Sequence, residues 1–329
     1  MSMHAIQVTD VGGPEAMKLV SLPLPAQATG EDVVVKVAAA GVNFIDTYHR
    51  SGLYPVASSP FTLGVEGAGV VDSVGPQVQG LAPGDRVAFI TRPPGGSYAE
   101  YAVVHASKVA PVPPGMDLDT AAAAMIQGMT ATALVSRAAP VRPGEWVLVT
   151  AAAGGTGRLV AQLARAAGAR VIGTASTPAK AAVAREAGCE AVVMYTEQDL
   201  AAEVLRLTGG CGAAAVFDGV GAATFDAALA AAAHLGFVVS YGNASGKVPP
   251  LDILRLSRNN VRLMRPALWD FVNTREEFRA LAGETLTAVA EGRLKVLVTG
   301  RYPLSQAARA HGELQGRATT GKLLLLPGA

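Results

Sequence analysis

The segment from residue 151 to residue 157 contains the residues with the clearest chemistry. A short apolar run ends just before it, and the segment reads Ala-Ala-Ala-Gly-Gly-Thr-Gly. Ala152, Gly154 and Gly157 take the three glycine positions of the G-x-G-x-x-G fingerprint, with alanine at the first. Small residues there allow a sharp turn after a strand, a close approach of the backbone to a pyrophosphate and tight packing of the next helix. The segment predicts a dinucleotide-binding turn, and a turn without a ligand is the alternative.

The residues that follow bear on the choice between NADPH and NADH. A Rossmann protein that selects NAD usually has an Asp or Glu about 20 positions after the fingerprint. No acid occurs between Arg170 and Arg185. Thr177 and Pro178 favour the start of a helix, which places Lys180 in its first turn. A cation there opposes the helix dipole unless an anion compensates it, so we predict NADPH, with Lys180 at its 2′-phosphate. A solvated surface lysine is the alternative.

The elements that position these residues change in kind along the chain. Up to about residue 120, short β-like runs alternate with Gly and Pro, which predicts a mostly β domain. Farther on, strands are expected at 146–150, 170–174, 191–195, 214–217 and 237–241, with helices at about 157–167 and from Pro178. This βα repetition predicts a parallel sheet. A polar helix at 274–291, a strand-like pair at 301–302 and a last helix from Ser305 follow. The predicted fold class is α/β with two packed domains.

Composition excludes several classes of function. The 329 residues contain 27 Lys and Arg against 26 Asp and Glu, so the net charge is +1, which argues against a nucleic-acid partner. No 18 apolar residues follow one another, so no membrane span is expected. The N-terminal residues do not form a signal peptide, which predicts a cytoplasmic location. Two cysteines, Cys189 and Cys211, provide neither a disulfide framework nor a four-thiolate zinc site.

Extended on both sides, the fingerprint segment carries a resemblance to a known family. It reads Gly144-Glu145-x-x-Leu148-x-x-x-Ala152-Ala153-Gly154-Gly155-x-Gly157-x-x-x-x-Gln162-x-x-Arg165. This resembles the signature of the quinone oxidoreductase and zeta-crystallin group of the medium-chain dehydrogenase/reductase superfamily. Segments 41–48, 51–55, 82–87 and 317–322 agree with it, so the similarity spans essentially the whole chain. It implies a chaperonin-10-like catalytic domain of residues 1–122 and 266–329, an inserted Rossmann domain of residues 123–265, and a homodimer.

The resemblance also implies the residues of the cofactor site. Ser176 and Lys180 match the residues that hold the 2′-phosphate in the family, where the tyrosine that matches Tyr195 also contributes. Tyr241 and Gly242 end a strand at the edge where a parallel sheet binds nicotinamide. The other cofactor-binding candidates are Thr130, Ala152, Gly154, Gly155, Thr156, Gly157, Gly173, Arg265 and Arg317. For the two arginines, surface salt bridges are the alternative.

In the zinc alcohol dehydrogenases of this superfamily, a Cys, a His and a second Cys hold the catalytic metal. The corresponding positions here resemble Asn43, Val65 and Gln127. None of them is a thiolate or an imidazole, so no zinc site of this pattern is expected. The amides of Asn43 and Gln127 are instead candidates to donate a hydrogen bond to a substrate carbonyl. With Asp46 three residues later, Asn43 is also typical of a helix N-cap, and the two roles are compatible.

Tyr48 and Tyr54 flank a turn and resemble the active-site tyrosines of the family. They are candidates to stack on a planar acceptor or to donate a proton, and a packing role is the alternative. The resemblance implies an NADPH-dependent quinone reductase that works without a metal on a small planar quinone. An NADPH-dependent reductase of an enone or an enoyl C=C bond is the first alternative. A crystallin-like or RNA-binding protein that holds the cofactor without significant turnover is the second.

Overall fold

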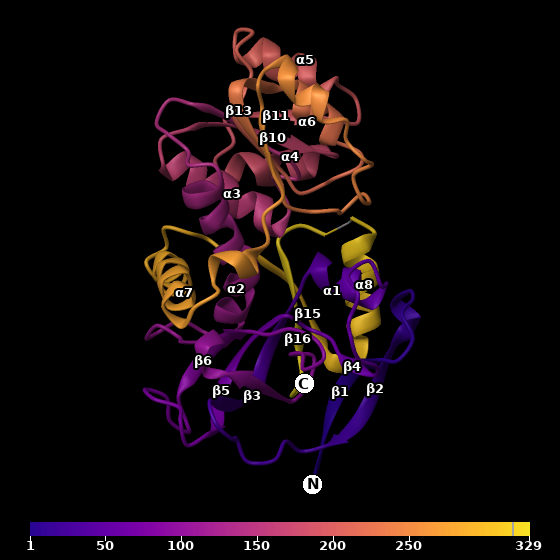
Figure 1. Cartoon of the computed structure of the whole chain (residues 1–329), viewed down its shortest axis with the longest axis vertical. Helices are drawn as coiled ribbons and strands as arrows, with labels where there is room; N and C mark the ends of the chain where they lie inside the picture. The colour runs from indigo at the N-terminus through magenta and orange to yellow at the C-terminus, as the bar shows by residue number, and fades with distance from the viewer. Residues whose placement is uncertain (318) are drawn as a thin grey trace. The chain divides into compact units, whose positions relative to one another are not determined.

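The computed structural model of the protein describes residues 1–317 and 319–329. The chain forms two compact units (Figure 1). The first unit contains Met1–Ile126 and Val272–Ala329, and the second contains Gln127–Phe271. Along the sequence the second unit is therefore an insertion in the first. The division after Ile126 falls inside one helix, α2 (Leu118–Ala133).

A parallel sheet forms the centre of the second unit. All of residues 127–271 are described, and six of their strands pair in the order β11-β10-β9-β12-β13-β14. Counted from the first strand of the unit, this order is 3-2-1-4-5-6, which is that of the dinucleotide-binding Rossmann fold. The strands are β9 (Trp146–Val149), β10 (Arg170–Ala175), β11 (Ala191–Met194), β12 (Ala213–Asp218), β13 (Ala232–Ser240) and β14 (Arg262–Met264).

Helices alternate with these strands and bury their apolar sides. In α3, Leu159, Val160 and Ala164 are buried. Helix α3 contacts β9 and β10. Each fully buried aliphatic side chain of the size of Val or Leu contributes about 1.5–3 kcal/mol. The helical segments are α3 (Gly155–Ala166), α4 (Pro178–Glu186), α5 (Leu200–Leu207), α6 (Phe225–Ala230), the π-helical turn Leu134–Ala138, and the 3-10 turns η4 (Ile253–Arg258) and η5 (Leu268–Phe271).

The first unit is mostly β. Among its described residues, seven strands form one sheet. Six of them follow one another in the order β15-β16-β3-β5-β6-β8, and β7 pairs with β3. Three strands form a second sheet in the order β2-β1-β4. β16, near the end of the chain, pairs with β3 from its beginning. The strands are β1 (Ser2–Val8), β2 (Met17–Pro23), β3 (Asp32–Val42), β4 (Phe61–Thr62), β5 (Glu66–Val74), β6 (Arg86–Ile90), β7 (Tyr101–His105), β8 (Val109–Pro111), β15 (Val298–Pro303) and β16 (Lys322–Leu326).

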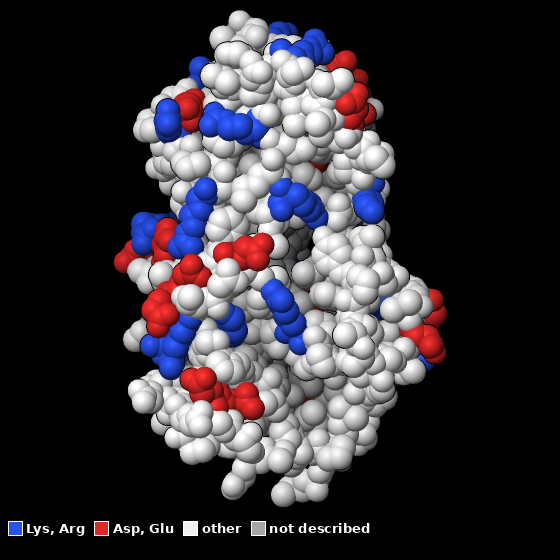
Figure 2. All heavy atoms as spheres, viewed as in Figure 1, with Lys and Arg blue, Asp and Glu red and all other residues white. Residues whose placement is uncertain are grey.

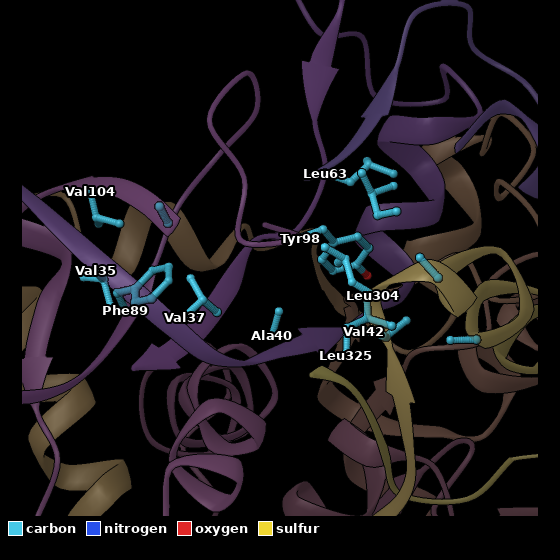
Figure 3. Close-up of a cluster of buried hydrophobic side chains, with 14 of the residues drawn as sticks. Val35, Val37, Ala40, Val42, Leu63, Phe89, Tyr98, Val104, Leu304 and Leu325 are labelled. Atoms are coloured by element: carbon cyan, nitrogen blue, oxygen red, sulfur yellow. The ribbon is translucent and has the colours of Figure 1, made fainter. Parts of the chain in front are cut away.

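Figure 3 shows the apolar core of this unit. Along β3, buried Val35 and Val37 alternate with exposed Lys36, which is the period of a strand that has one buried face. Phe89 from β6 and Leu325 from β16 are fully buried in the same cluster. The core therefore joins strands from both ends of the sequence.

Four α-helices of the described chain begin in the first unit: α1 (Phe44–Arg50), α2, α7 (Arg275–Ala290) and α8 (Ala307–Gln315). The polar helix that the sequence predicts at 274–291 is α7. Thr274 caps it, and the Glu277 side chain accepts the N–H of Thr274 in return. In contrast, α2 is buried continuously from Ala121 to Met125. The predicted fold class, α/β with a mostly β part and a Rossmann part, is confirmed.

Charges are dispersed over the face in view. Figure 2 shows Lys and Arg interspersed with Asp and Glu, and neither sign covers a continuous area of that face. This fits the net charge of +1. Within the described part of the chain, no helix has both the length and the apolar character needed to cross a membrane.

Candidate active site

The turn between β9 and α3 has the geometry that the fingerprint predicts. Ala151 lies just after β9 with a φ of 48°, in the left-handed region. The N–H groups of Ala151 and Ala152 donate to the hydroxyl and the carbonyl of Thr174 in β10, both at 3.1 Å. A Cβ at Gly157 would overlap the carbonyl oxygen of Ala151. The helix therefore packs this closely on the turn only because position 157 is glycine.

The N-terminus of α3 is built to receive an anion. Its N-cap, Gly154, makes no side-chain capping bond, and the first turn of the helix contains no acid. Neighbouring helices differ, since Thr177 caps α4 by accepting the N–H of Lys180, and Asp199 caps α5 by accepting that of Ala202. The first N–H groups of a helix need acceptors, and a pyrophosphate supplies them. The turn and this helix end therefore fit a dinucleotide.

Helix α2 brings two further candidates to the same unit. Gln127 and Thr130 lie three positions apart, on one face of the helix. Gln127 is 9% exposed, and a Cβ at Gly155 would overlap its amide. Glycine at position 155 thus leaves the space that the Gln127 amide occupies. The structure places this amide against the first turn of α3, while Thr130 is half-buried.

The loop after β10 is built as the sequence predicts. Thr177 is the N-cap of α4 and Pro178 is its first residue, so both predictions are confirmed. Lys180 lies in the first turn and is half-buried, as is Ser176 between the strand and the helix. The two residues predicted at the 2′-phosphate are therefore close in the chain, on either side of the helix start.

Two further candidates of the fingerprint region lie beside the turn. Gly173 is in β10, where a Cβ would lie 2.8 Å from the Cβ of Ala152 and 2.6 Å from the sulfur of Cys189. Glycine therefore lets the turn pass over the strand. Thr156 is the second residue of α3 and is half-buried.

The remaining candidates of the second unit follow other strands. Tyr241 and Gly242 come directly after β13, and a Cβ at Gly219 would lie 2.7 Å from the Tyr241 ring. Arg265 donates to the carbonyl oxygens on both sides of Tyr241, at 2.7 and 3.2 Å. It therefore holds the turn that presents this tyrosine. Tyr195 comes directly after β11 and is half-buried.

Asp218, at the end of β12, is a positioning residue that sequence reasoning missed. Its buried carboxylate accepts the hydroxyls of Thr150 and Thr224, at 2.8 and 2.7 Å, and the N–H groups of Val220 and Gly221, at 3.2 and 3.3 Å. It thus fixes the loop against which Tyr241 packs. A strand-end Asp followed by Gly-Val-Gly was the available signal.

In the first unit, the predicted N-cap role of Asn43 is confirmed. Asn43 precedes α1, and the Asp46 carboxylate accepts its backbone N–H at 2.8 Å. The side-chain amide is 5% exposed and is bonded at both ends. Its Nδ2 donates to Glu66 Oε1 at 2.6 Å, and its Oδ1 accepts from Lys322 Nζ at 2.7 Å. Asn43 is therefore part of a buried polar cluster that the sequence did not predict.

Glu66 and Lys322 form an ion pair in which both side chains are 0% exposed. The second oxygen of Glu66 accepts the backbone N–H of Ile126 in α2. Gly41 permits this arrangement, because a Cβ there would overlap the Glu66 carboxylate. Loss of one partner of a buried pair leaves an uncompensated charge and costs several kcal/mol, so each of these two groups requires the other.

A directed chain of hydrogen bonds leads to Asp46 from the other side. Arg50 can donate but not accept, so Nδ1 of His311 accepts from it at 3.1 Å. The proton of His311 is then on Nε2 and is donated to the Tyr98 oxygen at 3.0 Å. The Tyr98 hydroxyl in turn donates to Asp46 Oδ2 at 3.1 Å.

Burial is the largest influence on the pKa values of the residues in this chain of hydrogen bonds. It raises the pKa of Asp46 to about 7, against the N–H of Asn43 and the charge of Lys322, which lower that pKa. The other oxygen of Asp46 is buried and has no hydrogen-bond partner among the described residues. Burial, and next the charge of Arg50, lower the pKa of His311 to about 3, so the imidazole is neutral. Burial also raises the pKa of Tyr98 well above its ordinary value.

The structure brings Tyr48 and Tyr54 together. Their ring centroids are 5.2 Å apart in an edge-on arrangement, and the N–H of Tyr54 donates to the carbonyl of Tyr48 at 3.0 Å. Tyr48 is buried in α1, whereas Tyr54 is half-buried in the turn that follows. Arg317 also belongs to this unit, where it is exposed after α8 with a φ of 54°.

Two family models match different parts of the chain. The alcohol dehydrogenase GroES-like domain family matches residues 29–114, and the zinc-binding dehydrogenase family matches residues 155–286. A quinone oxidoreductase of Pseudomonas aeruginosa is 41% identical over 98% of this chain and 99% of its own length. The chain belongs to the quinone oxidoreductase family. The predicted membership of this group of medium-chain dehydrogenases/reductases is thereby confirmed.

Two other proteins are similar to the chain over nearly its whole length. The solved structure of a mycobacterial protein complexed with NADPH is 44% identical, with a TM-score of 0.95, and the match covers 98% of this chain and 100% of that one. A 2-haloacrylate reductase of a Burkholderia species is 38% identical over 97% of each chain. Among the described residues of the chain, no three His, Cys, Asp or Glu side chains gather as metal ligands.

Proposed function

We propose that the protein is an NADPH-dependent quinone reductase that needs no metal. The observation that carries the proposal is the small-residue turn before the uncapped N-terminus of α3, beside the helix start that holds Lys180. It is supported by the mycobacterial relative, which is complexed with NADPH, and by the relative from Pseudomonas aeruginosa, which is a quinone oxidoreductase.

The second unit is proposed to hold NADPH through three groups of contacts. The pyrophosphate lies on the first turn of α3, where Ala152, Gly154, Gly155, Thr156 and Gly157 leave room for it. Ser176, Lys180 and Tyr195 bind the 2′-phosphate. Tyr241 and Gly242 line a strand end near the nicotinamide, with Arg265 behind them. Gly173 supports the fingerprint turn, and Thr130 and Arg317 are the other cofactor-binding residues of the proposal. Residues 123–265 are accordingly proposed as the cofactor domain, and residues 1–122 and 266–329 as the catalytic domain.

Bound NADPH supplies a hydride, which carries two electrons. Asn43 and Gln127 are each proposed as an amide donor to the acceptor carbonyl. Neutral donors suffice where the developing charge is delocalised over a quinone. Tyr48 and Tyr54 stack on the planar ring, as aromatic side chains do. Formation of the hydroquinone also requires one proton, which comes from solvent or from one of these tyrosines.

The chemical types at three positions support a reaction without zinc. Asn43, Val65 and Gln127 offer no thiolate, imidazole or carboxylate, the groups that bind zinc in proteins. Activity is therefore expected to survive exhaustive dialysis against a chelator. Stoichiometric zinc in the purified enzyme, together with loss of turnover on its removal, would contradict the proposal.

The direct test mixes the protein with NADPH and a panel of small quinones and follows the nicotinamide absorbance. The expected result is rapid oxidation of NADPH with at least one quinone and slower oxidation of NADH at the same concentration. Mixtures without protein or without quinone are the controls. Tight NADPH binding with no oxidation by any quinone or enone would instead favour the cofactor-binding role without turnover.

Reduction of an activated C=C bond is the second candidate, favoured by the relative that is a 2-haloacrylate reductase. The same donors would polarise a carbonyl or carboxylate conjugated with the double bond, and hydride transfer to carbon would be followed by protonation of the neighbouring carbon. A higher kcat/KM for an enone or a haloacrylate than for every quinone tested would select this candidate.

We further propose a homodimer in the cytoplasm. The dimer is supported by the edge strand β14, which is flanked by exposed apolar residues of η4, because an open strand edge pairs readily with a second copy. The exposed thiol of Cys211 fits a reducing compartment.

A further inference from the structure

Lys322 and Glu66 form a fully buried ion pair to which the proposed reaction gives no role. They come from β16 and β5, which lie far apart in the sequence. Both groups meet on the amide of Asn43, with the ammonium at its oxygen and the carboxylate at its nitrogen. Burial of two charges is expensive, so a pair at this position calls for a reason beyond packing.

The pair determines which way the Asn43 amide points. The Lys322 ammonium can only donate, so the oxygen of the Asn43 amide must face it. The Glu66 carboxylate can only accept, so the NH2 group of the amide must face the carboxylate. Rotation of the amide by half a turn would place oxygen against carboxylate and NH2 against ammonium. Both contacts would then be repulsive, so the buried pair holds the amide in one orientation.

One N–H of the amide is still weakly held. Glu66 accepts the first from Nδ2 at 2.6 Å, whereas the second contact of Nδ2, with the carbonyl oxygen of Gly41, is 3.4 Å long. Such a length is near the limit of a hydrogen bond, so another acceptor can replace Gly41 at small cost. The ammonium at Oδ1 also draws electrons from the nitrogen and strengthens it as a donor.

We propose that the Lys322–Glu66 pair positions the Asn43 amide so that its second N–H is presented to the carbonyl oxygen of the substrate. The inference rests on the proposed function, which gives Asn43 its role as a donor. Lys322 and Glu66 are positioning residues, since they act through Asn43. The candidates for phosphate binding lie in the other unit, so the pair acts on transfer to the acceptor and leaves NADPH affinity unchanged.

The test replaces the pair by apolar side chains of similar volume, Glu66→Leu with Lys322→Met, because a single substitution would leave a lone buried charge. With a quinone as acceptor, kcat is expected to fall about 10- to 100-fold, as for a misplaced reacting group. The KM for NADPH is expected to stay unchanged. Asn43→Ala is expected to give a similar loss, and the triple variant is expected to be no slower than Asn43→Ala, since both changes remove one shared interaction.

Tyr98→Phe is the matched control. It breaks the bond to Asp46 in the same buried cluster without touching the Asn43 amide, and its ring stays packed by Leu63 and Leu304 (Figure 3). It is expected to lower stability but not kcat. If the apolar pair does not fold, by circular dichroism, Glu66→Gln with Lys322→Met takes its place.

Failure of the inference differs from failure of the proposed function. If the wild-type protein binds NADPH but reduces no quinone, both the proposed function and the inference are wrong. A wild-type enzyme that is active, whose apolar-pair variant keeps full kcat or whose losses simply add in the triple variant, overturns the inference alone. Equal losses in kcat and in NADPH affinity would also overturn it, because they indicate general damage to the fold.

Discussion

Lys180 is the residue on which the choice between the two nicotinamide cofactors depends. It lies in the first turn of α4, where the helix dipole disfavours a cation unless an anion is bound. Lys180→Ala is therefore expected to weaken NADPH binding about 10- to 100-fold, the worth of a charge-assisted hydrogen bond of about 1.5–3 kcal/mol, and to leave NADH almost unaffected. Titration of both cofactors by calorimetry measures this.

Arg185→Ala is the control for Lys180, because it removes a cation from the last turn of the same helix. It is expected to leave the ratio of the two affinities unchanged. Equal losses of NADPH and NADH affinity in Lys180→Ala would remove this lysine from the 2′-phosphate site.

Asp46 and His311 give stability opposite dependences on pH. The pKa of Asp46 is raised from 3.8 to about 7, so between these values the folded state holds a proton that the unfolded state has lost, and stability falls as pH rises. The pKa of His311 is lowered from 6.5 to about 3, so in that window the unfolded state holds the extra proton, and stability rises with pH. The two contributions nearly cancel between about pH 4 and 6.5.

Substitution of either residue should expose the contribution of the other. Relative to wild type, the free energy of unfolding of His311→Gln is expected to fall as pH rises from about 4 to 6.5, by up to about 1.4 kcal/mol per pH unit. That of Asp46→Asn is expected to rise over the same range by a similar amount. Urea unfolding at several pH values, followed by circular dichroism, gives these differences. Variant curves that run parallel to the wild-type curve would show that burial shifts neither pKa in this way.

At the scale of single elements, α3 depends on glycine at position 157. Gly157→Ala would push the helix away from the carbonyl of Ala151, so we expect a loss of about 1–3 kcal/mol and much weaker NADPH binding. Both tryptophans, Trp146 and Trp269, lie in the second unit, so their fluorescence during urea unfolding reports on it. Gly283→Ala is the control, because its Cβ would meet open space in α7 and should stabilise that helix by up to about 1 kcal/mol.

Elements with a clear period or cap were predictable, whereas the buried connections between them were not. The caps Thr177 and Thr274 and the fingerprint turn have local signals, and the structure contains them. The helix α2 was missed, because its alanine run is apolar on all sides and shows no face. The partners of Asn43 were missed for another reason. Glu66 and Lys322 lie 256 positions apart in the sequence, and no local pattern joins them.

At the scale of the whole molecule, each unit has its own apolar core, and the sheet of the second unit ends in an open edge at β14. Just before that strand, Ile253 and Leu254 of η4 are 75% and 73% exposed, and Leu235 and Met264 are also exposed. Two copies related by a two-fold axis can pair their β14 strands and cover these side chains, which removes both an open edge and an apolar surface.

Ile253→Asp with Leu254→Asp is therefore expected to convert a dimer into monomers of 33.4 kDa in sedimentation velocity, because charges would be buried without partners at the interface. NADPH affinity should persist, since none of the proposed phosphate-binding residues is changed. Val11→Asp, at an exposed apolar residue of the first unit, should leave the dimer intact. A wild-type chain that sediments as a monomer would contradict the proposed dimer, whereas a double variant that stays dimeric would place the partner surface elsewhere.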